Sequence, residues 1–267
     1  MKTIEMIVVS PGRAGGALAL AAEVAGHRIV GVVSRSGAFT GRFPQVSDGA
    51  DLPAADLLVI ATRDSDIEPT AERLAPVSQR IGAAVHMSGF KSIGALAPLA
   101  RLGIATGSFH PLQSLSDPET GARSLAGAWA GLTAAEPLFG TLTDLATSLE
   151  MIPFPLRDAD KPLYHAAAAA ASNYVIAALD LAGALVASAS VPFEALVPLV
   201  RTAVGNAFSL GPTAALTGPI ARGDWDTVRG QFEALASALP DRTKQFRLMA
   251  EATAITAGTN LPRDLHD

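Results

Sequence analysis

The sequence predicts an α/β protein in which a doubly wound, mostly parallel sheet is followed by an all-helical domain. In the first half, short apolar runs alternate with helical patterns, which is typical of parallel strands covered on both faces. The composition changes near residues 153–161, PFPLRDADK, and strand patterns stop there. A glycine-rich turn joins the first strand pattern to the first helical pattern, as in many nucleotide-binding α/β proteins.

The individual patterns give the expected elements in order. Strands are predicted over Thr3–Val9, Arg28–Val33, Leu57–Ala61, Ala83–Met87, Ile104–Ser108, Trp129–Ala134 and Met151–Phe154. Helices are predicted between them over Gly15–Ala25, Ile67–Arg80, Ile93–Arg101 and Pro137–Glu150, and Ala38–Pro53 has the composition of a loop. The second half predicts helices over Leu163–Ala187, Phe193–Ser209, Trp225–Leu239 and Asp241–Gly258, with Asp241 as N-cap and Gly258 as C-terminal stop. We therefore expect two domains, residues 1–157 and 158–267.

Composition limits the classes of function. Of the 267 residues, 49% are hydrophobic and 17% are charged, which is typical of a folded globular protein. The net charge of −5 argues against a nucleic-acid partner, which would bind a basic surface. The absence of cysteine excludes disulfides and thiolate chemistry and favours a cytoplasmic location. We expect the apolar stretch Ala166–Val200 to form buried helices, with no membrane span, because polar residues and prolines interrupt it.

The turn in the stretch IVVSPGRAGG matches the dinucleotide-binding pattern G-x-G-x-x-G with one substitution. Ser10, Gly12 and Gly15 occupy the three glycine places. The second glycine lets the backbone approach a pyrophosphate, and the third lets the helix pack closely on the strand. We therefore predict a Rossmann-type site in which Ser10, Gly12, Arg13, Ala14 and Gly15 hold the phosphates. The competing interpretation is an ordinary strand-to-helix loop.

The end of the second strand pattern indicates which cofactor is bound. Ser34, Arg35 and Ser36 stand where an NAD site usually carries an acidic residue for the ribose hydroxyl. An arginine there accommodates a 2′-phosphate, so we predict NADP; the alternative is a solvated surface arginine. The third strand pattern ends in further expected cofactor-binding residues, Ala61, Thr62 and Arg63.

A series of motifs in fixed order resembles a known family along nearly the whole chain. The motifs are SPGRAGGALA, VVSRS, IATRDSDI, HMSGF, GSFHPLQSL, YHAAAAAASNY and ALTGPIARGD. They resemble the Rossmann-like proteins whose C-terminal half is a domain of unknown function, which are related to pyrroline-5-carboxylate reductase, ketopantoate reductase and the 6-phosphogluconate dehydrogenase superfamily. The resemblance implies a helical dimerisation domain and NADP-dependent reduction, and it leaves the substrate open.

Five residues are candidates for catalysis. Lys161 and His165 are four residues apart and would share a helix face, from which either could serve as proton donor. Ser88 and His110 follow predicted strands; Ser88 could hold a substrate carboxylate, and His110 could donate a proton or fix the turn at Pro111. The fifth candidate is Asn173, which lies about 12 Å from His165 along the helix. For each residue a structural role remains the alternative: a surface lysine, a core histidine or a buried asparagine with a packing partner.

These observations predict an NADP-dependent reductase of a small 2-oxo or imino acid, with a ketopantoate-like substrate favoured by the resemblance alone. The alternative is a regulatory protein that senses a nucleotide without turnover. The histidine spacing does not suggest a metal site, and Ser88 lacks the G-x-S-x-G pattern of a hydrolase. The glycines and prolines of residues 205–219 indicate breaks between helices, either plain loops or a wall of the substrate pocket. The alanine-rich second half also predicts a homodimer formed through residues 160–258.

Overall fold

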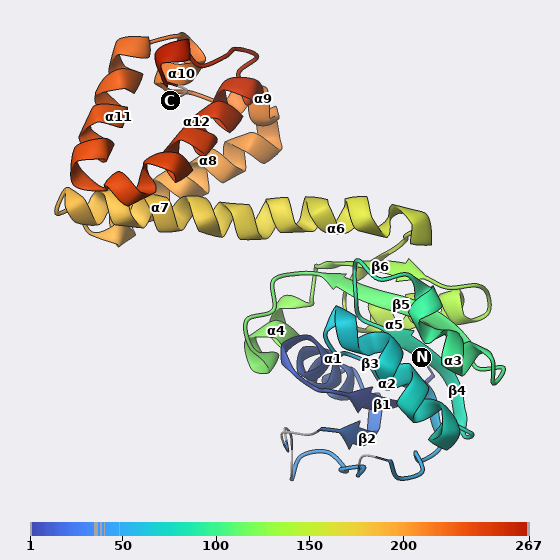
Figure 1. Cartoon of the computed structure of the whole chain (residues 1–267). Helices are drawn as coiled ribbons and strands as arrows, with labels where there is room; N and C mark the ends of the chain where they lie inside the picture. Colours follow the sequence, from blue (N-terminus) through green and yellow to red (C-terminus); the bar gives the residue numbers. More distant parts are fainter. Residues whose placement is uncertain (1, 35–36, 38, 40, 48, 266–267) are drawn as a thin grey trace. The chain divides into compact units, whose positions relative to one another are not determined.

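The computed structural model describes residues 2–34, 37, 39, 41–47 and 49–265. Contacts between residues divide the chain into two compact units, residues 1–169 and 170–267 (Figure 1). The first unit is α/β and the second is helical, which confirms the predicted fold class. The division between residues 157 and 158 that composition suggested stays a prediction. By contacts, the start of the long helix that follows the sheet belongs with the first unit.

A seven-stranded sheet with the order β2-β1-β3-β4-β5-β6-β7 forms the centre of the first unit. Its strands are β1 (Glu5–Val9), β2 (Arg28–Val33), β3 (Ala55–Ile60), β4 (Ile81–His86), β5 (Ala105–Leu112), β6 (Trp129–Thr133) and β7 (Ile152–Pro155). All neighbouring strands are parallel except β5 and β6, so the sheet is mostly parallel, as predicted. The first five carboxyl ends therefore meet at one edge of the sheet, where ligands of such folds bind.

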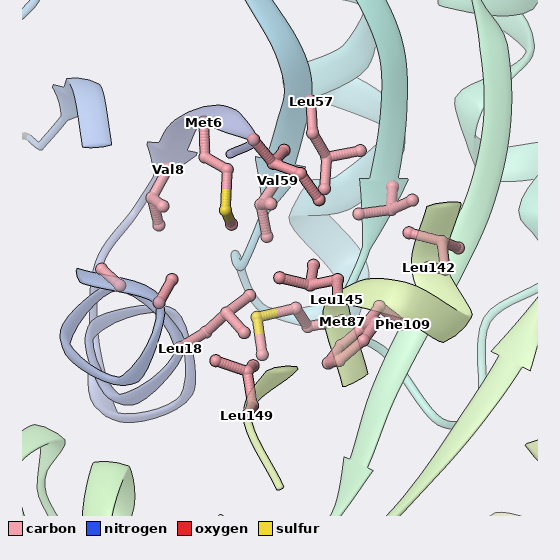
Figure 2. Packing of buried hydrophobic residues seen from close by; sticks show 14 of the residues in the cluster. Met6, Val8, Leu18, Leu57, Val59, Met87, Phe109, Leu142, Leu145 and Leu149 are labelled. Atoms are coloured by element: carbon pink, nitrogen blue, oxygen red, sulfur yellow. The ribbon is translucent and has the colours of Figure 1, made fainter. Parts of the chain in front are cut away.

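Side chains of alternating strand positions build two cores, one on each face of the sheet. One face carries Val8, Val59 and Val85 and is covered by α1 (Arg13–Val24) and α5 (Leu138–Ser148). Figure 2 shows this core, in which Leu18, Leu145 and Leu149 surround Met87 and Phe109. The other face carries Ile7, Leu58 and Ala84 and packs against α2 (Ile67–Leu74) and α3 (Ala97–Ala100). The two covered faces explain why the strands are apolar throughout.

Two predicted helices on the second face are shorter than expected, and each contains a proline. The helix expected over residues 67–80 ends at Leu74 and continues as a 3-10 turn, Ala75–Val77, around Pro76. The helix expected over residues 93–101 is a 3-10 turn, Ile93–Leu96, followed by the single turn α3 with Pro98. Proline lacks an N–H group and disfavours helical geometry in the residue before it, which explains both corrections.

Strand β5 is longer than predicted, and this changes the position of the candidate His110. It runs to Leu112, so His110 lies within a strand and not after one. The extension is paired with β6 in antiparallel register, in which Leu112 faces Trp129. The helix α4 (Pro118–Ser124) was not predicted; it is capped by the Asp117 side chain, which accepts a hydrogen bond from the Thr120 backbone N–H at 2.8 Å.

The long helix after β7 begins at Lys161, two residues earlier than predicted. It consists of α6 (Lys161–Ala169), a π-helical segment (Ala170–Tyr174) and α7 (Val175–Ser188). The span Asp158–Ser188 is 31 residues long with a mean hydropathy of 1.5, so it is long and apolar enough to cross a membrane. Only 6% of its most apolar window is buried, so the expectation of buried helices is wrong for the isolated chain. Length and composition are weak evidence for a span, and the absence of a membrane partner and the cytoplasmic location stay predictions.

The second unit contains further helices around a small core. They are α8 (Leu196–Leu210), α9 (Pro212–Ala215), α10 (Pro219–Arg222), α11 (Trp225–Ala238) and α12 (Thr243–Thr256). The core consists of buried residues of α11, α12 and the C-terminal segment: Val228, Phe232, Ala250, Ala254, Leu261 and Leu265. The helix expected to begin at residue 193 starts with a 3-10 turn, Phe193–Ala195.

Two expected helix boundaries in the second unit are wrong and two are right. Gly205 does not break α8, whereas Gly211, with a φ of 85°, ends it. Asp241 lies in a 3-10 turn, so α12 begins only at Thr243 and Asp241 is not its N-cap. Gly258 adopts a φ of 71° just after α12, which confirms it as the C-terminal stop.

Candidate functional site

Ser10 adopts the backbone conformation that the dinucleotide-binding turn requires of its first glycine. Its φ is 60°, in the left-handed region that favours glycine. Its N–H donates to the Val33 carbonyl at 2.8 Å, and its own carbonyl accepts from the Gly12 N–H at 2.7 Å. The left-handed conformation costs a non-glycine residue about 1–2 kcal/mol. The serine is thus a change of residue type without a change of turn geometry.

The other two glycines have the separate roles expected of them. A Cβ atom at Gly15 would lie 2.6 Å from the Ala61 Cβ and 3.2 Å from Val8 Cγ1, so only glycine allows α1 to approach the sheet this closely. A Cβ atom at Gly12 would meet only the Ser10 carbonyl oxygen, at 3.9 Å, and therefore points into open space. Helix α1 has no side-chain cap and no acidic residue in its first turn. This arrangement fits a bound pyrophosphate at the start of the helix, where backbone N–H groups and the helix dipole attract anions.

The ends of β2 and β3 carry the remaining cofactor candidates. Arg35 and Ser36 lie outside the described residues, while Ser34 is described at the end of β2. At the end of β3, the Ala61 N–H donates to the Val9 carbonyl at 3.0 Å, which joins this end to the glycine turn. The Thr62 hydroxyl oxygen is buried and has no hydrogen-bond partner in the part of the chain that the structure describes. A buried hydroxyl without a partner favours a polar ligand group or a water at this edge.

Residues 86–93, which we call the β4 loop, are held in place by side chains at both ends. His86 is fully buried; its Nδ1 accepts from the Ser88 N–H at 3.2 Å, and its Nε2 is 3.3 Å from the Ser92 carbonyl. Together these contacts require the neutral ring with the proton on Nε2. Burial, with a further contribution from Lys161, lowers the pKa of His86 to about 4, so this ring remains neutral at pH 7. The Asp158 carboxylate accepts from the Ser92 hydroxyl at 2.5 Å and from the Ile93 N–H at 3.0 Å.

Ser88 and Lys161 meet directly at the start of this loop. The Ser88 hydroxyl oxygen accepts from the N–H groups of Phe90 at 3.1 Å and Lys91 at 2.9 Å, so it closes the loop while its proton remains available. The Ser88 carbonyl accepts from Lys161 Nζ at 3.0 Å. Lys161 is completely buried, and this burial lowers its pKa to about 8, although Asp158 and Asp64 act in the opposite direction.

The Lys161 ammonium carries more donors than the protein satisfies. It has three N–H groups, and only the bond to Ser88 is made within the described residues. A buried ammonium is costly unless its donors are used. Two remaining donors therefore indicate that water or a ligand accepts from Lys161, at the end of β4.

His110 lies beside this lysine, on the neighbouring strand β5. Its Nδ1 is 2.7 Å from the Tyr164 hydroxyl, and an added Cβ at Gly89 would lie 2.7 Å from its Nε2, so the ring packs directly over that glycine. Burial, followed by the charges of His165 and Lys161, lowers the pKa of His110 to about 4. Ser108 lies on the same face two residues earlier, and its buried hydroxyl has no partner among the described residues.

The structure brings together four of the five predicted catalytic residues. His165 is exposed on α6, with its ring centroid 6.0 Å from that of Phe90 and 6.4 Å from that of His110. Lys161 on the same helix is buried, so the two candidates have different environments. Asn173 belongs to the second unit, where it lies in the π-helical segment and its side-chain oxygen accepts from the Ser172 hydroxyl at 3.4 Å.

Two family models match the chain. A Rossmann-like domain matches residues 2–111, and the domain of unknown function DUF2520 matches residues 128–253. The chain thus combines a Rossmann-like domain with DUF2520. Because the DUF2520 match begins just before β6, this domain contributes β6, α5 and β7 to the sheet unit as well as α6 and most of the helices of the second unit. A search of curated proteins found no match.

Solved structures with the same fold cover nearly the whole chain. One is a Bacteroides fragilis protein described, provisionally, as an NADP oxidoreductase (TM-score 0.80, 20% identity, 95% of this chain and 98% of that chain). Another is a Streptomyces aurantiacus imine reductase (TM-score 0.67, 15% identity, 96% of both chains). A third is the Plasmodium falciparum pyrroline carboxylate reductase with NADP bound (TM-score 0.63, 13% identity, 95% and 99%). At these identities the likeness shows the fold.

Three residues of the site were not among the sequence candidates. Asp158 and Tyr164 lie within the DUF2520 match, and His86 lies at the end of β4 in the Rossmann-like domain. Tyr164 stands in the motif YHAAAAAASNY, directly before the candidate His165. This position next to a candidate could have identified Tyr164 from the sequence. Nothing in the sequence indicates that Asp158 reaches Ser92, because 66 residues separate the two.

Proposed function

We propose that this protein is an NADP-dependent reductase of a small 2-oxo or imino acid. The observation that carries the proposal is the buried Lys161, whose ammonium has spare donors and lies 3.0 Å from the Ser88 carbonyl, beside His110. Ser88 follows β4, His110 lies in the second half of β5, and Lys161 reaches them from α6, at the sheet edge to which the glycine turn also belongs. In open α/β sheets, ligands bind at that edge. The provisional NADP oxidoreductase and the imine and pyrroline carboxylate reductases among the similar structures support the same class.

The residues of the first unit fit a dinucleotide. Gly12 offers an open side to the pyrophosphate, Gly15 brings α1 against the sheet, and the buried Thr62 hydroxyl lacks a partner among the described residues. Arg35 is proposed to bind the 2′-phosphate, which selects NADP over NAD. When bound, NADPH supplies the hydride that reduces a carbonyl or imine carbon. Replacing Arg35 by alanine should reduce the preference for NADPH over NADH by about 1–3 kcal/mol, measured by titration calorimetry.

The chain's own residues would provide the charge and the proton that reduction requires. As a carbonyl carbon is reduced, negative charge develops on its oxygen, and a proton must follow. The Lys161 ammonium would stabilise that charge with its free donors, and its low pKa would ease proton transfer. His110 lies beside Lys161, the Ser88 O–H group belongs to the residue whose carbonyl Lys161 contacts, and His165 is the exposed alternative on α6.

Two observations bear on the choice of substrate within this class. The motif resemblance favours a ketopantoate-like 2-oxo acid, whereas the similar imine and pyrroline carboxylate reductases favour an imino acid. Both remain within the proposal. Both have a carboxylate next to a polarised double bond, which the cation of Lys161 would attract.

The test is a panel of 2-oxo acids and cyclic imines with NADPH, followed by the nicotinamide absorbance. Replacing Lys161 by methionine should lower kcat about 100-fold or more with little change in NADPH affinity, because its interaction with the substrate is strongest in the transition state. His165→Ala tests the exposed candidate in the same way, and Lys2→Met, at an exposed lysine outside residues 160–258, is the control.

One outcome would change the assigned proton donor, and another would contradict the proposal. If Lys161→Met and His165→Ala both keep native turnover and helix content, the proton donor is Ser88 or His110. If NADPH binds and no compound of the panel is reduced, the protein senses the nucleotide without turnover and is not a reductase.

We also propose that the active form is a homodimer through residues 160–258. Large apolar side chains of this region are exposed in the isolated chain, including Leu163 (79%), Phe208 (89%) and Ile255 (76%). Exposed large apolar side chains of this kind are typical of a protein interface. A second copy would cover them.

A further inference from the structure

The hydrogen bond between Tyr164 and His110 determines which nitrogen of His110 carries a proton. The Tyr164 hydroxyl is 2.7 Å from Nδ1, and the rings are nearly perpendicular at 87°. Within the described residues, the hydroxyl makes this bond alone, and Nε2 makes none. The question is therefore which of the two partners donates.

Donation by Tyr164 is the arrangement that uses the phenol proton. If Nδ1–H donated instead, the phenol would accept, and both the phenol proton and the Nε2 lone pair would have no partner in the described part of the chain. Donation by Tyr164 leaves only the Nε2–H group for a ligand or water, so fewer partly buried polar groups are without a partner. With Tyr164 as the donor, Nδ1 is the acceptor and the ring proton must be on Nε2.

Both partners are uncharged at neutral pH. Burial raises the pKa of Tyr164 to about 12, and burial, together with His165 and Lys161, lowers the pKa of His110 to about 4. The titratable groups that act on His110 come from two elements: Lys161 and His165 from α6, and Asp64 from the 3-10 turn after β3. Lys161 opposes a charge on the ring and Asp64 favours it.

We propose that Tyr164 holds His110 in the Nε2–H tautomer, so that His110 offers a hydrogen-bond donor to the reacting atom and selects a carbonyl oxygen over a protonated imine. An Nε2–H group needs a partner with a lone pair. A carbonyl oxygen has two, whereas the nitrogen of a protonated imine has none and is itself a donor. Tyr164 is thus a positioning residue that acts through His110. The inference rests on the proposed reductase function and narrows its substrate class.

Gly89 supports this role of the His110 ring. An added Cβ at Gly89 would be 2.7 Å from both Cε1 and Nε2, so any larger residue would displace the edge that carries the proton. The ring is therefore held at Nδ1 by Tyr164, and the missing side chain of Gly89 leaves the room that its Nε2 edge occupies.

The tautomer can be measured without any substrate, in protein labelled with 15N-histidine. Two-dimensional 15N–1H spectra distinguish Nδ1–H from Nε2–H rings, and His110→Gln assigns the resonance. We expect the Nε2–H form in the native protein and a mixture of tautomers in Tyr164→Phe. The chain has only two tyrosines, so Tyr174→Phe is the matched control and should leave the His110 signals unchanged. A native Nδ1–H form, or a Tyr164→Phe spectrum identical to the native one, would overturn the proposal.

The selectivity is tested with two five-carbon acids, 2-oxopentanoate and the cyclic imine 1-pyrroline-2-carboxylate, each with NADPH. The native enzyme should reduce the oxo acid with the higher kcat/KM at a pH where the imine is protonated. Tyr164→Phe should lower kcat/KM for the oxo acid about tenfold, the equivalent of one hydrogen bond, without changing NADPH affinity. The same substitution should lower kcat/KM for the imine by a smaller factor, and Tyr174→Phe should have the kcat/KM values of the native enzyme.

The outcomes separate this proposal from the proposed function. Preference for the protonated imine overturns the selectivity even if the protein is a reductase. If neither acid is reduced, the reductase function fails for this pair, and the His110 spectrum still decides the donor. In that case, adding 2-oxopentanoate with NADP must shift the Nε2–H resonance in the native protein; an unshifted resonance overturns the proposal.

Discussion

At the scale of single residues, the site contains ionisable side chains that are buried away from solvent. His86 and Lys161 are both fully buried, and each is kept in place by hydrogen bonds to the β4 loop. Burial disfavours the charged form of both, so their pKa values are lowered. Ser10 is unfavourable for another reason, because its backbone adopts the left-handed conformation in the glycine turn. The buried ionisable side chains and the strained Ser10 backbone both lower stability at positions where a ligand is expected to bind.

Replacing Ser10 by glycine should stabilise the protein by about 0.5–1 kcal/mol. The change removes the left-handed penalty of about 1–2 kcal/mol, and the greater freedom of glycine in the unfolded chain offsets part of the gain. Urea unfolding measures the difference. Ser190 has a φ of 57°, so Ser190→Gly should stabilise the protein as well. Ser47 has no positive φ, so Ser47→Gly should destabilise it. Equal effects at Ser10 and Ser47 would show that the turn is not strained.

The neutral His86 should make the protein sensitive to acid. Its pKa is 6.5 when unfolded and about 4 when folded, so the unfolded chain binds the proton first as the pH falls. The stability is complete above pH 6.5 and is lost progressively down to pH 4, by about 3 kcal/mol for this residue. His86→Gln cannot take up this proton, so its unfolding free energy should fall less over that range, as measured by urea unfolding. Above pH 7 the two curves should run parallel; parallel curves between pH 6.5 and 4 would contradict the lowered pKa.

At the scale of elements, the two glycines of the turn between β1 and α1 have different roles, one in packing and one in the proposed cofactor binding. Gly15 faces the protein, where a Cβ would lie 2.6 Å from Ala61, and Gly12 faces open space. The two positions are three residues apart in one short turn. Their substitution by alanine therefore tests the proposed cofactor site with nearly matched variants.

Gly15→Ala should destabilise the protein by about 1–3 kcal/mol, because the extra methyl overpacks the contact between helix and sheet. Gly12→Ala should leave the free energy of unfolding within about 0.5 kcal/mol, as expected for a substitution away from the core, and weaken NADPH binding about tenfold or more by occupying the ligand side of the turn. Urea unfolding and calorimetric titration give the two values. If Gly12→Ala binds NADPH as tightly as the native protein, the pyrophosphate lies elsewhere.

At the scale of the whole molecule, the main feature is the apolar surface that the isolated chain leaves uncovered. Exposed large apolar residues are concentrated in the long helix and in α8, among them Leu163, Ile176, Leu199 and Phe208. The sheet unit, by contrast, has two well-filled cores. The proposed homodimer would bury this surface.

Light scattering at micromolar concentration should therefore report a dimer. Phe208→Glu and Ile255→Glu should shift the protein toward the monomer, because each would bury a charge in the interface. Val24→Glu is the matched control, since Val24 is 85% exposed on α1, outside residues 160–258. A native monomer would remove the proposal, and binding to lipid vesicles in place of dimerisation would assign the apolar helix to a membrane.

The sequence by itself determined the fold class, the strand order along the chain and the glycine turn. These follow from local rules: continuous apolar runs mark strands buried on both faces, and the spacing of Ser10, Gly12 and Gly15 marks the turn. It also selected Ser88, His110 and Lys161, because each stands at the end of a strand or the start of a helix. Prolines limited the prediction, since Pro76 and Pro98 change helix type over a few residues.

Only the tertiary structure decided which of these residues meet and what state they are in. Lys161 reaches Ser88 across 73 positions and Tyr164 reaches His110 across 54. The length of β5 depended on its antiparallel partner β6, and Ser10 was shown to keep the glycine conformation only by its φ. Contacts between distant residues depend on how strands align and helices pack, and burial then sets the protonation of each group. No local pattern contains that information, because the partner that buries a residue is supplied by another part of the chain.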